Sequence, residues 1–160
     1  MEERINIFLA DLESQKKEVL KIYSSLDSKV NELRKNINNE DLTNSLAYKL
    51  HNLYSAYEDM FKLIAEFFEN QIEGATRYHI DLLRRMKIRI NGIRPNLLSD
   101  ESFNLLDELR GFRHLFRHAY GYELEAERII RVTEKAMTLK KIFEMDFELF
   151  VNSIIGKDDR

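Results

Sequence analysis

The chain contains very few residues that interrupt helices. Its 160 residues include one proline and five glycines, whereas a β-sandwich or barrel needs a turn about every 8–12 residues. Cysteine is absent, which excludes disulfides, thiolate catalysis and sulfur-ligated metal centres. The length is that of one domain. We therefore expect a single all-α domain.

Apolar residues recur at steps of three and four, which is the spacing of an amphipathic helix. The clearest stripe runs from Leu46 to Phe68, and Ser99 followed by two acidic residues is typical of a helix start. The predicted helices cover residues 3–35, 42–70, 75–91, 99–119 and 123–154. Such a pattern favours an antiparallel bundle of four or five helices.

The organisation that we expect is one helical domain over residues 1–160, with an N-terminal helix over 1–36 and a core over 40–155. The formal net charge is −3, which argues against a general polycation that coats nucleic acid. The N-terminus lacks the apolar core of a signal peptide, and no apolar run approaches the roughly 18 residues of a membrane span. We expect a cytoplasmic protein with no membrane partner.

One segment, residues 109–122, concentrates cations on one side of a predicted helix. At about 100° per residue, Arg117 and Arg110 lie within about 60° of Arg113, and His114 and His118 follow at about 100° and 140°. The opposite side is apolar. Every cation in this segment is Arg or His, and none is Lys.

Three interpretations of this cluster remain open. A solvated basic face explains the charge but not the choice of Arg and His. A metal site at His114 and His118 is disfavoured, because Arg113 and Arg117 would repel a divalent cation. The third is an anion site, in which Arg binds a phosphate and His moves a proton. No metal and no cofactor are predicted, since no Gly-rich phosphate loop is present and no Glu stands three residues before a histidine.

A second basic segment lies at residues 77–94, where six basic residues and one acidic residue give a local charge of +5. Charge concentrated in this way is the expected footprint of a polyanion, and a solvated helix face explains it equally well. The basic residues are Arg77, Arg84, Arg85, Lys87, Arg89 and Arg94.

The sequence resembles HEPN-domain ribonuclease toxins of the HepT type. Arg113, four residues, His118, one residue and Tyr120 match the family's R-x-x-x-x-H-x-Y motif, and Gly-Phe before the motif and Glu-Arg-Ile at 127–129 are also similar. Tyr-Glu-Asp-Met at 57–60 stands where the family's second helix would be. The resemblance covers roughly residues 40–150. The chain departs from the family at His114, where a small polar residue is usual, and at Arg117, where an aliphatic residue is usual.

This resemblance implies a helical bundle that forms a homodimer, with the motifs of two chains facing one cleft. It implies metal-independent cleavage of RNA, with Arg113 and His118 as the catalytic residues. It also implies an antitoxin partner, a minimal nucleotidyltransferase that attaches AMP to Tyr120, and a larger complex with it. The alternative is a non-catalytic HEPN-fold module that pairs with a nucleotidyltransferase or nucleic acid. Further RNA contacts are predicted at Arg110, His114, Arg117, Arg84 and Arg85.

Overall fold

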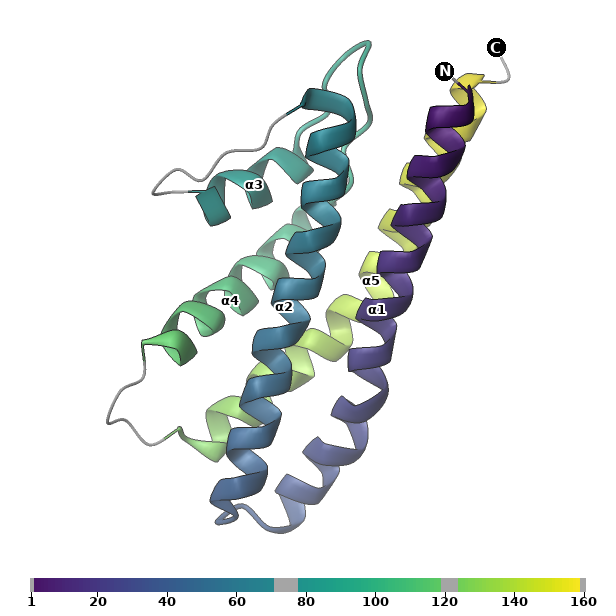
Figure 1. Ribbon diagram of the computed structural model, residues 1–160. Coiled ribbons are helices and arrows are strands. Elements are labelled where there is room, and N and C mark those ends of the chain that lie inside the picture. The colour runs from purple at the N-terminus through teal and green to yellow at the C-terminus, as the bar shows by residue number, and fades with distance from the viewer. Residues whose placement is uncertain (1, 71–77, 119–123, 159–160) are drawn as a thin grey trace.

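The computed structural model describes residues 2–70, 78–118 and 124–158, and this part of the chain is an all-α fold (Figure 1). It contains no strand, only an isolated bridge between Ile90 and Arg94. None of its helices has both the length and the apolar character that crossing a membrane requires. The helices are α1 (Glu2–Lys35), α2 (Glu40–Glu69), α3 (Tyr78–Lys87), α4 (Asp100–Arg117) and α5 (Ala126–Asp158).

Three long helices form the body of the bundle. Helix α2 packs antiparallel to α1, and α5 runs back along α1 so that the start of α1 and the end of α5 lie at the same end of the bundle (Figure 1). Helices α3 and α4 pack against α2, and α4 also contacts α5. The predicted antiparallel bundle is confirmed.

The core consists of apolar side chains from all five helices, and the predicted stripe on α2 supplies its centre. From Leu46 to Ile64 every stripe residue is fully buried, while Phe68 is only partly buried. Two core tyrosines join α1 to α2, because the hydroxyls of Tyr23 and Tyr57 share a hydrogen bond of 2.7 Å. Full burial of one large apolar side chain contributes about 1.5–3 kcal/mol to the free energy of folding. Burial of this stripe therefore determines which face of α2 packs into the bundle.

Side chains at the starts of α2 and α4 satisfy the first backbone amides. Asn39 accepts a hydrogen bond from the Leu42 amide at 3.0 Å. Ser99 accepts one from the Ser102 amide at 3.3 Å and donates its own hydroxyl to Asp146 of α5 at 2.9 Å. The predicted cap at Ser99 is confirmed, and it also ties α4 to α5.

The third helix is shorter than predicted, because α3 ends at Lys87 and not at residue 91. After Lys87 the chain turns back, and the backbone amides of Leu97 and Leu98 donate to the Met86 carbonyl. Gly92 adopts a left-handed conformation with φ of 78° in this turn, which glycine adopts without steric cost. Contacts from the returning chain therefore replace the next turn of helix.

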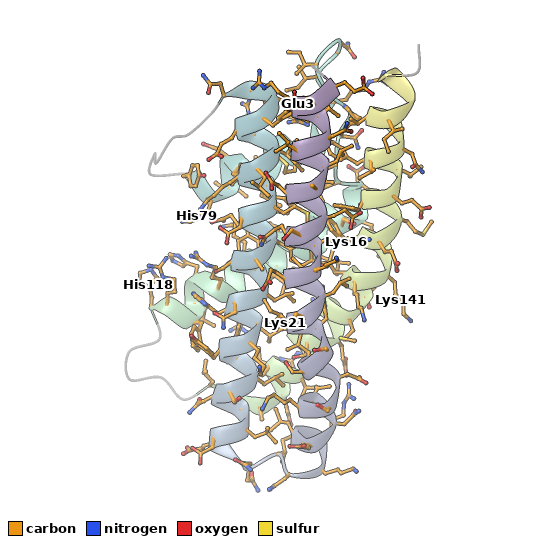
Figure 2. All side chains as sticks on the ribbon, turned by 45° about the vertical axis from the view of Figure 1, so that its right-hand side comes forward. Glu3, Lys16, Lys21, His79, His118 and Lys141 are labelled. Carbon is orange, nitrogen blue, oxygen red and sulfur yellow. The ribbon has the colours of Figure 1, made fainter. Side chains whose placement is uncertain are left out.

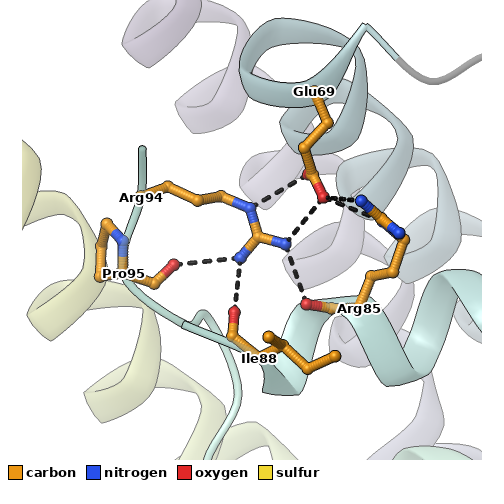
Figure 3. Close-up of polar contacts among 5 residues, drawn as sticks. All are labelled: Glu69, Arg85, Ile88, Arg94 and Pro95. Carbon is orange, nitrogen blue, oxygen red and sulfur yellow. Dashed lines mark hydrogen bonds and ion pairs between the residues drawn. The ribbon is translucent and has the colours of Figure 1, made fainter. Parts of the chain in front are cut away.

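Arg94 is fully buried under this turn and completes the end of α3 (Figure 3). Its guanidinium donates to Glu69 at 3.1 Å and to the carbonyls of Arg85, Ile88 and Pro95 at 2.9–3.1 Å. Arg85 pairs with the same Glu69 carboxylate. The expectation that 77–94 forms one exposed basic patch is therefore wrong for Arg94, whose charge is neutralised inside the fold.

Candidate active site on helix α4

Helix α4 has an apolar face in the bundle and a basic face outside it. Leu106, Leu109 and Phe112 are buried, and Arg113 is partly exposed. The exposed basic side chains at the end of the helix are His114, Arg117 and His118. Together with Arg113 they make up the α4 cations. The helix ends at Arg117, so His118 is the residue at which the chain leaves it. The structure thus brings the predicted cations to one exposed helix end.

Arg113 is fixed by a contact with the neighbouring helix. Its Nε donates a hydrogen bond to the Ser55 hydroxyl of α2 at 3.2 Å. That hydroxyl donates its own proton to the His51 carbonyl at 3.1 Å, so its oxygen lone pairs are left to accept from Arg113. Within the described residues, the two terminal nitrogens of Arg113 make no hydrogen bond. They form a fork that suits two oxygens of a phosphate.

His114 and His118 lie against each other at the end of α4. Their ring centroids are 4.5 Å apart, and the rings are inclined by 55°. The backbone amide of His118 bonds to the carbonyls of His114 and Leu115 at 3.2 Å. Figure 2 shows His118 at the outer end of its helix, clear of the three long helices. Both imidazoles are therefore open to solvent.

The other predicted RNA contacts differ in their surroundings. Arg110 is partly exposed and pairs with Asp107 of its own helix at 2.9 Å. Arg84 is exposed on α3. Arg85 pairs with Glu69 at the end of α2, so the structure places it in the network of Figure 3. Tyr120, the predicted site of AMP attachment, lies outside the described residues.

A third histidine, which the sequence interpretation did not single out, lies beside the cluster. His51 of α2 packs against Phe116 of α4 with ring centroids 5.4 Å apart. Burial lowers the pKa of His51, and the positive charges of Arg113 and Arg117 lower it further, against the raising effect of the hydrogen bond that its ring donates to the Asn52 side-chain oxygen. The spacing of His51 and Ser55 puts them on one face of α2, but only packing shows that this face meets α4.

Another histidine that the sequence interpretation missed is paired with a buried carboxylate. Glu58 is 3% exposed, and both of its oxygens lie 2.9 Å from Nδ1 of the half-exposed His79. Figure 2 shows His79 and His118 on the same side of the molecule. The hydroxyl of Tyr54, one turn before Glu58 on α2, is buried without a hydrogen-bond partner among the described residues. Burial raises the pKa of Tyr54, and the charge of Glu58 raises it further.

Among the residues that the structure describes, the site offers no ready metal centre. In the part of the chain that the structure describes, no three His, Cys, Asp or Glu side chains come together in a way that could hold an ion. A hollow of about 640 Å³ lies elsewhere, between α1 and α5, and is lined by residues such as Arg34 and Glu134. The α4 cations do not line that hollow. They form an open surface of guanidinium and imidazole groups.

The all-α bundle is consistent with a HEPN-like domain. The family model described as HepT-like protein matches residues 45–154. The chain therefore belongs to the HepT-like family, and the match spans α2 to α5. Membership suggests a HEPN-type toxin and implies toxin–antitoxin pairing in general. Searches of curated proteins and of solved structures found no match.

Proposed function

We propose that this protein is a toxin-type endoribonuclease that cleaves RNA without a metal ion. The observation that carries the proposal is the end of α4, where Arg113 presents its terminal nitrogens and His118 reaches solvent on the same short segment. Family membership supports a HEPN-type toxin. A guanidinium and an imidazole together supply what cleavage at a 2′-hydroxyl requires, which is charge stabilisation and proton transfer.

Arg113 binds the scissile phosphate in this proposal. Its fork donates to the two non-bridging oxygens, whose negative charge grows as the pentacovalent transition state forms. The hydrogen bond to Ser55 holds the Nε edge of the guanidinium, which leaves the two terminal nitrogens to bind the phosphate. Loss of one donor that stabilises such charge typically costs about 10²–10³ in rate.

His118 acts as the general base. Its imidazole takes the proton of the ribose 2′-hydroxyl, and the 2′-oxygen attacks the adjacent phosphorus while the bond to the 5′-oxygen breaks. The products are a 2′,3′-cyclic phosphate and a free 5′-hydroxyl. Positioned proton transfer contributes about 10²–10⁴ in rate. Because the 2′-hydroxyl is the nucleophile, DNA is not cut.

The leaving 5′-oxygen needs a proton from the opposite side of the phosphorus. We propose that His118 of a second copy of this chain supplies it, so that a homodimer with facing motifs completes the site. His114, Arg117, Arg110 and Arg84 contact RNA beyond the scissile phosphate. Arg85 is the weakest of the predicted contacts, because it is paired with Glu69.

The antitoxin is a minimal nucleotidyltransferase in this proposal, and it transfers AMP from ATP to the hydroxyl oxygen of Tyr120 with release of pyrophosphate and of the hydroxyl proton. Tyr120 follows His118 by two residues in the sequence. An added AMP carries one negative charge, and in this proposal it competes with the RNA phosphate for the α4 cations. The toxin and antitoxin assemble into a complex larger than the homodimer.

The test is cleavage of a labelled RNA by the purified protein in excess EDTA. We expect cleavage, a cyclic phosphate at the new 3′ end, and loss of cleavage when a single 2′-deoxynucleotide replaces the cut position. Arg113→Ala and His118→Ala abolish it, whereas Arg131→Ala, which removes an exposed arginine of α5, does not. A requirement for a divalent cation would overturn the mechanism. Tight binding of a nucleotidyltransferase or of RNA without cleavage would favour the non-catalytic module.

A further inference from the structure

Three aromatic rings form a ledge next to the α4 cations. Tyr48 and His51 lie one turn apart on α2 with nearly parallel rings, 6.4 Å between centroids and 10° between planes. Phe116 of α4 adjoins both, at 6.5 Å from Tyr48 and 5.4 Å from His51. Phe116 rests on the core, whereas Tyr48 is 57% exposed. The ledge therefore has a supported inner side and an outer side in solvent.

The ledge adjoins the residues that bind phosphate in the proposed mechanism. His51 and Ser55 are separated by one turn of α2, and Ser55 accepts the hydrogen bond from Arg113. Arg117 follows Phe116 directly in the sequence. The charges of Arg113 and Arg117 are both felt at His51, and they act with burial to lower its pKa. That shift favours the neutral imidazole, which is a flat aromatic surface with no added positive charge.

We propose that the ledge of Tyr48, His51 and Phe116 stacks an unpaired nucleobase of the RNA whose phosphate lies on Arg113. The proposal rests on the proposed function and deepens it, because it defines the substrate as single-stranded RNA. Proteins that bind single strands combine aromatic surfaces for the bases with a positive surface for the backbone. A base within a duplex already stacks on its neighbours and cannot lie on the ledge.

The charges beside the ledge favour an RNA base with its phosphate over an apolar protein surface. The charged groups that act on His51 are both arginines, so the rim of the ledge attracts an anion. The exposed member, Tyr48, has an apolar ring and a polar hydroxyl, which suits a base with one face stacked and its edge in water. A nucleotide supplies both an aromatic face and an adjacent phosphate.

The experiment measures binding of a short uridine-rich RNA that carries one 2-aminopurine and is 2′-O-methylated throughout, so that it is not cut. The 2-aminopurine is moved along the strand in a series. With the wild-type protein we expect its fluorescence to be quenched at one or two positions, because stacking quenches this base. Tyr48→Ala removes the quenching and weakens binding roughly 5- to 100-fold, while Tyr48→Phe keeps both.

Salt dependence separates stacking from charge. Loss of a phosphate contact lowers the slope of log affinity against log salt by about 0.7 for a single strand. Arg117→Ala is expected to show that change, whereas Tyr48→Ala lowers the affinity at every salt concentration with the slope unchanged. Ile93→Ala is the matched control, because Ile93 is an exposed apolar side chain in the turn that follows α3. Ile93→Ala is expected to leave both the affinity and the slope unchanged.

The outcomes show whether the stacking proposal fails alone or fails together with the proposed function. If the wild-type protein neither binds nor cleaves RNA, both are wrong. If it cleaves RNA but Tyr48→Ala binds and quenches like wild type, only the ledge is wrong. A Tyr48→Ala variant that loses dimer mass in light scattering without any loss of quenching would make the ledge a protein contact. Equal affinity for a duplex of the same sequence would also overturn the stacking proposal.

Discussion

Arg113 of α4 donates its Nε hydrogen to the hydroxyl of Ser55 on α2, and this bond of 3.2 Å connects the proposed catalytic arginine to the helix that forms the centre of the core. An exposed arginine ordinarily has several flexible side-chain torsions. Here the hydroxyl of Ser55 holds one edge of the guanidinium. The other edge then has a defined direction before any RNA binds.

We predict that Ser55→Ala lowers the rate of RNA cleavage about tenfold, since Arg113 then has to be ordered by the substrate. The loss is expected in kcat more than in KM. Ser55→Thr keeps the hydroxyl and restores the rate. Ser25→Ala is the matched control, because the Ser25 hydroxyl donates to the carbonyl of Ile22 within its own helix, α1. Equal rates for the Ala and Thr variants at Ser55 would contradict a positioning role.

A second prediction concerns the buried Arg94. Arg94→Met removes one partner of a buried ion pair and leaves the carbonyls at the end of α3 without their donor, so the free energy of unfolding falls by about 3–5 kcal/mol. Arg94→Lys recovers little, because an ammonium cannot reproduce the planar set of donors. Urea denaturation measures the free energy of unfolding of both variants.

Arg84→Met is the control for Arg94, since Arg84 is exposed on α3 and its loss is expected to change stability by less than about 0.5 kcal/mol. If Arg94→Met and Arg84→Met had equal midpoints in urea, the network of Figure 3 would have no structural importance.

A third prediction concerns the pair of Glu58 and His79. His79→Ala leaves a buried carboxylate without its partner, and we expect a loss of about 1–3 kcal/mol in the free energy of unfolding. His114→Ala serves for comparison, because His114 is an exposed histidine, and it is expected to change stability by less than about 0.5 kcal/mol. A stable His79→Ala variant would show that Glu58 finds water or another donor.

A fourth prediction concerns pH. The folded protein lowers the pKa of His51, so the unfolded chain binds a proton at a higher pH than the folded chain. The contribution of His51 to stability is therefore complete above the unfolded pKa of about 6.5 and decreases as the pH falls below it. The free energy of unfolding of His51→Gln is expected to decrease less than that of wild type between about pH 7.5 and about pH 5.5. A parallel decrease in both proteins would show that His51 does not titrate differently on folding.

The sequence was most informative where a residue acts within its own helix. The α2 stripe and the cap at Ser99 were predicted because helical spacing and capping are local properties. The side of α4 that carries Arg113 and His114 was predicted for the same reason. The end of α3 was predicted wrongly. Hydrogen bonds from Arg94, which lies in the turn of chain after α3, replace the expected last turn of helix. No property of residues 88–91 alone indicates that contact.

The scarcity of proline and glycine, together with a helix period of about 3.6 residues, therefore determined that the chain is an all-α bundle. The same period determined that α4 carries cations on its outer face. Tertiary packing decided which helices are neighbours. Only that packing brings Ser55 to Arg113, Tyr48 and His51 to Phe116, and Glu58 to His79. These pairs lie on different helices, and their contact depends on how the buried faces fit together, which the order of residues along one helix does not specify.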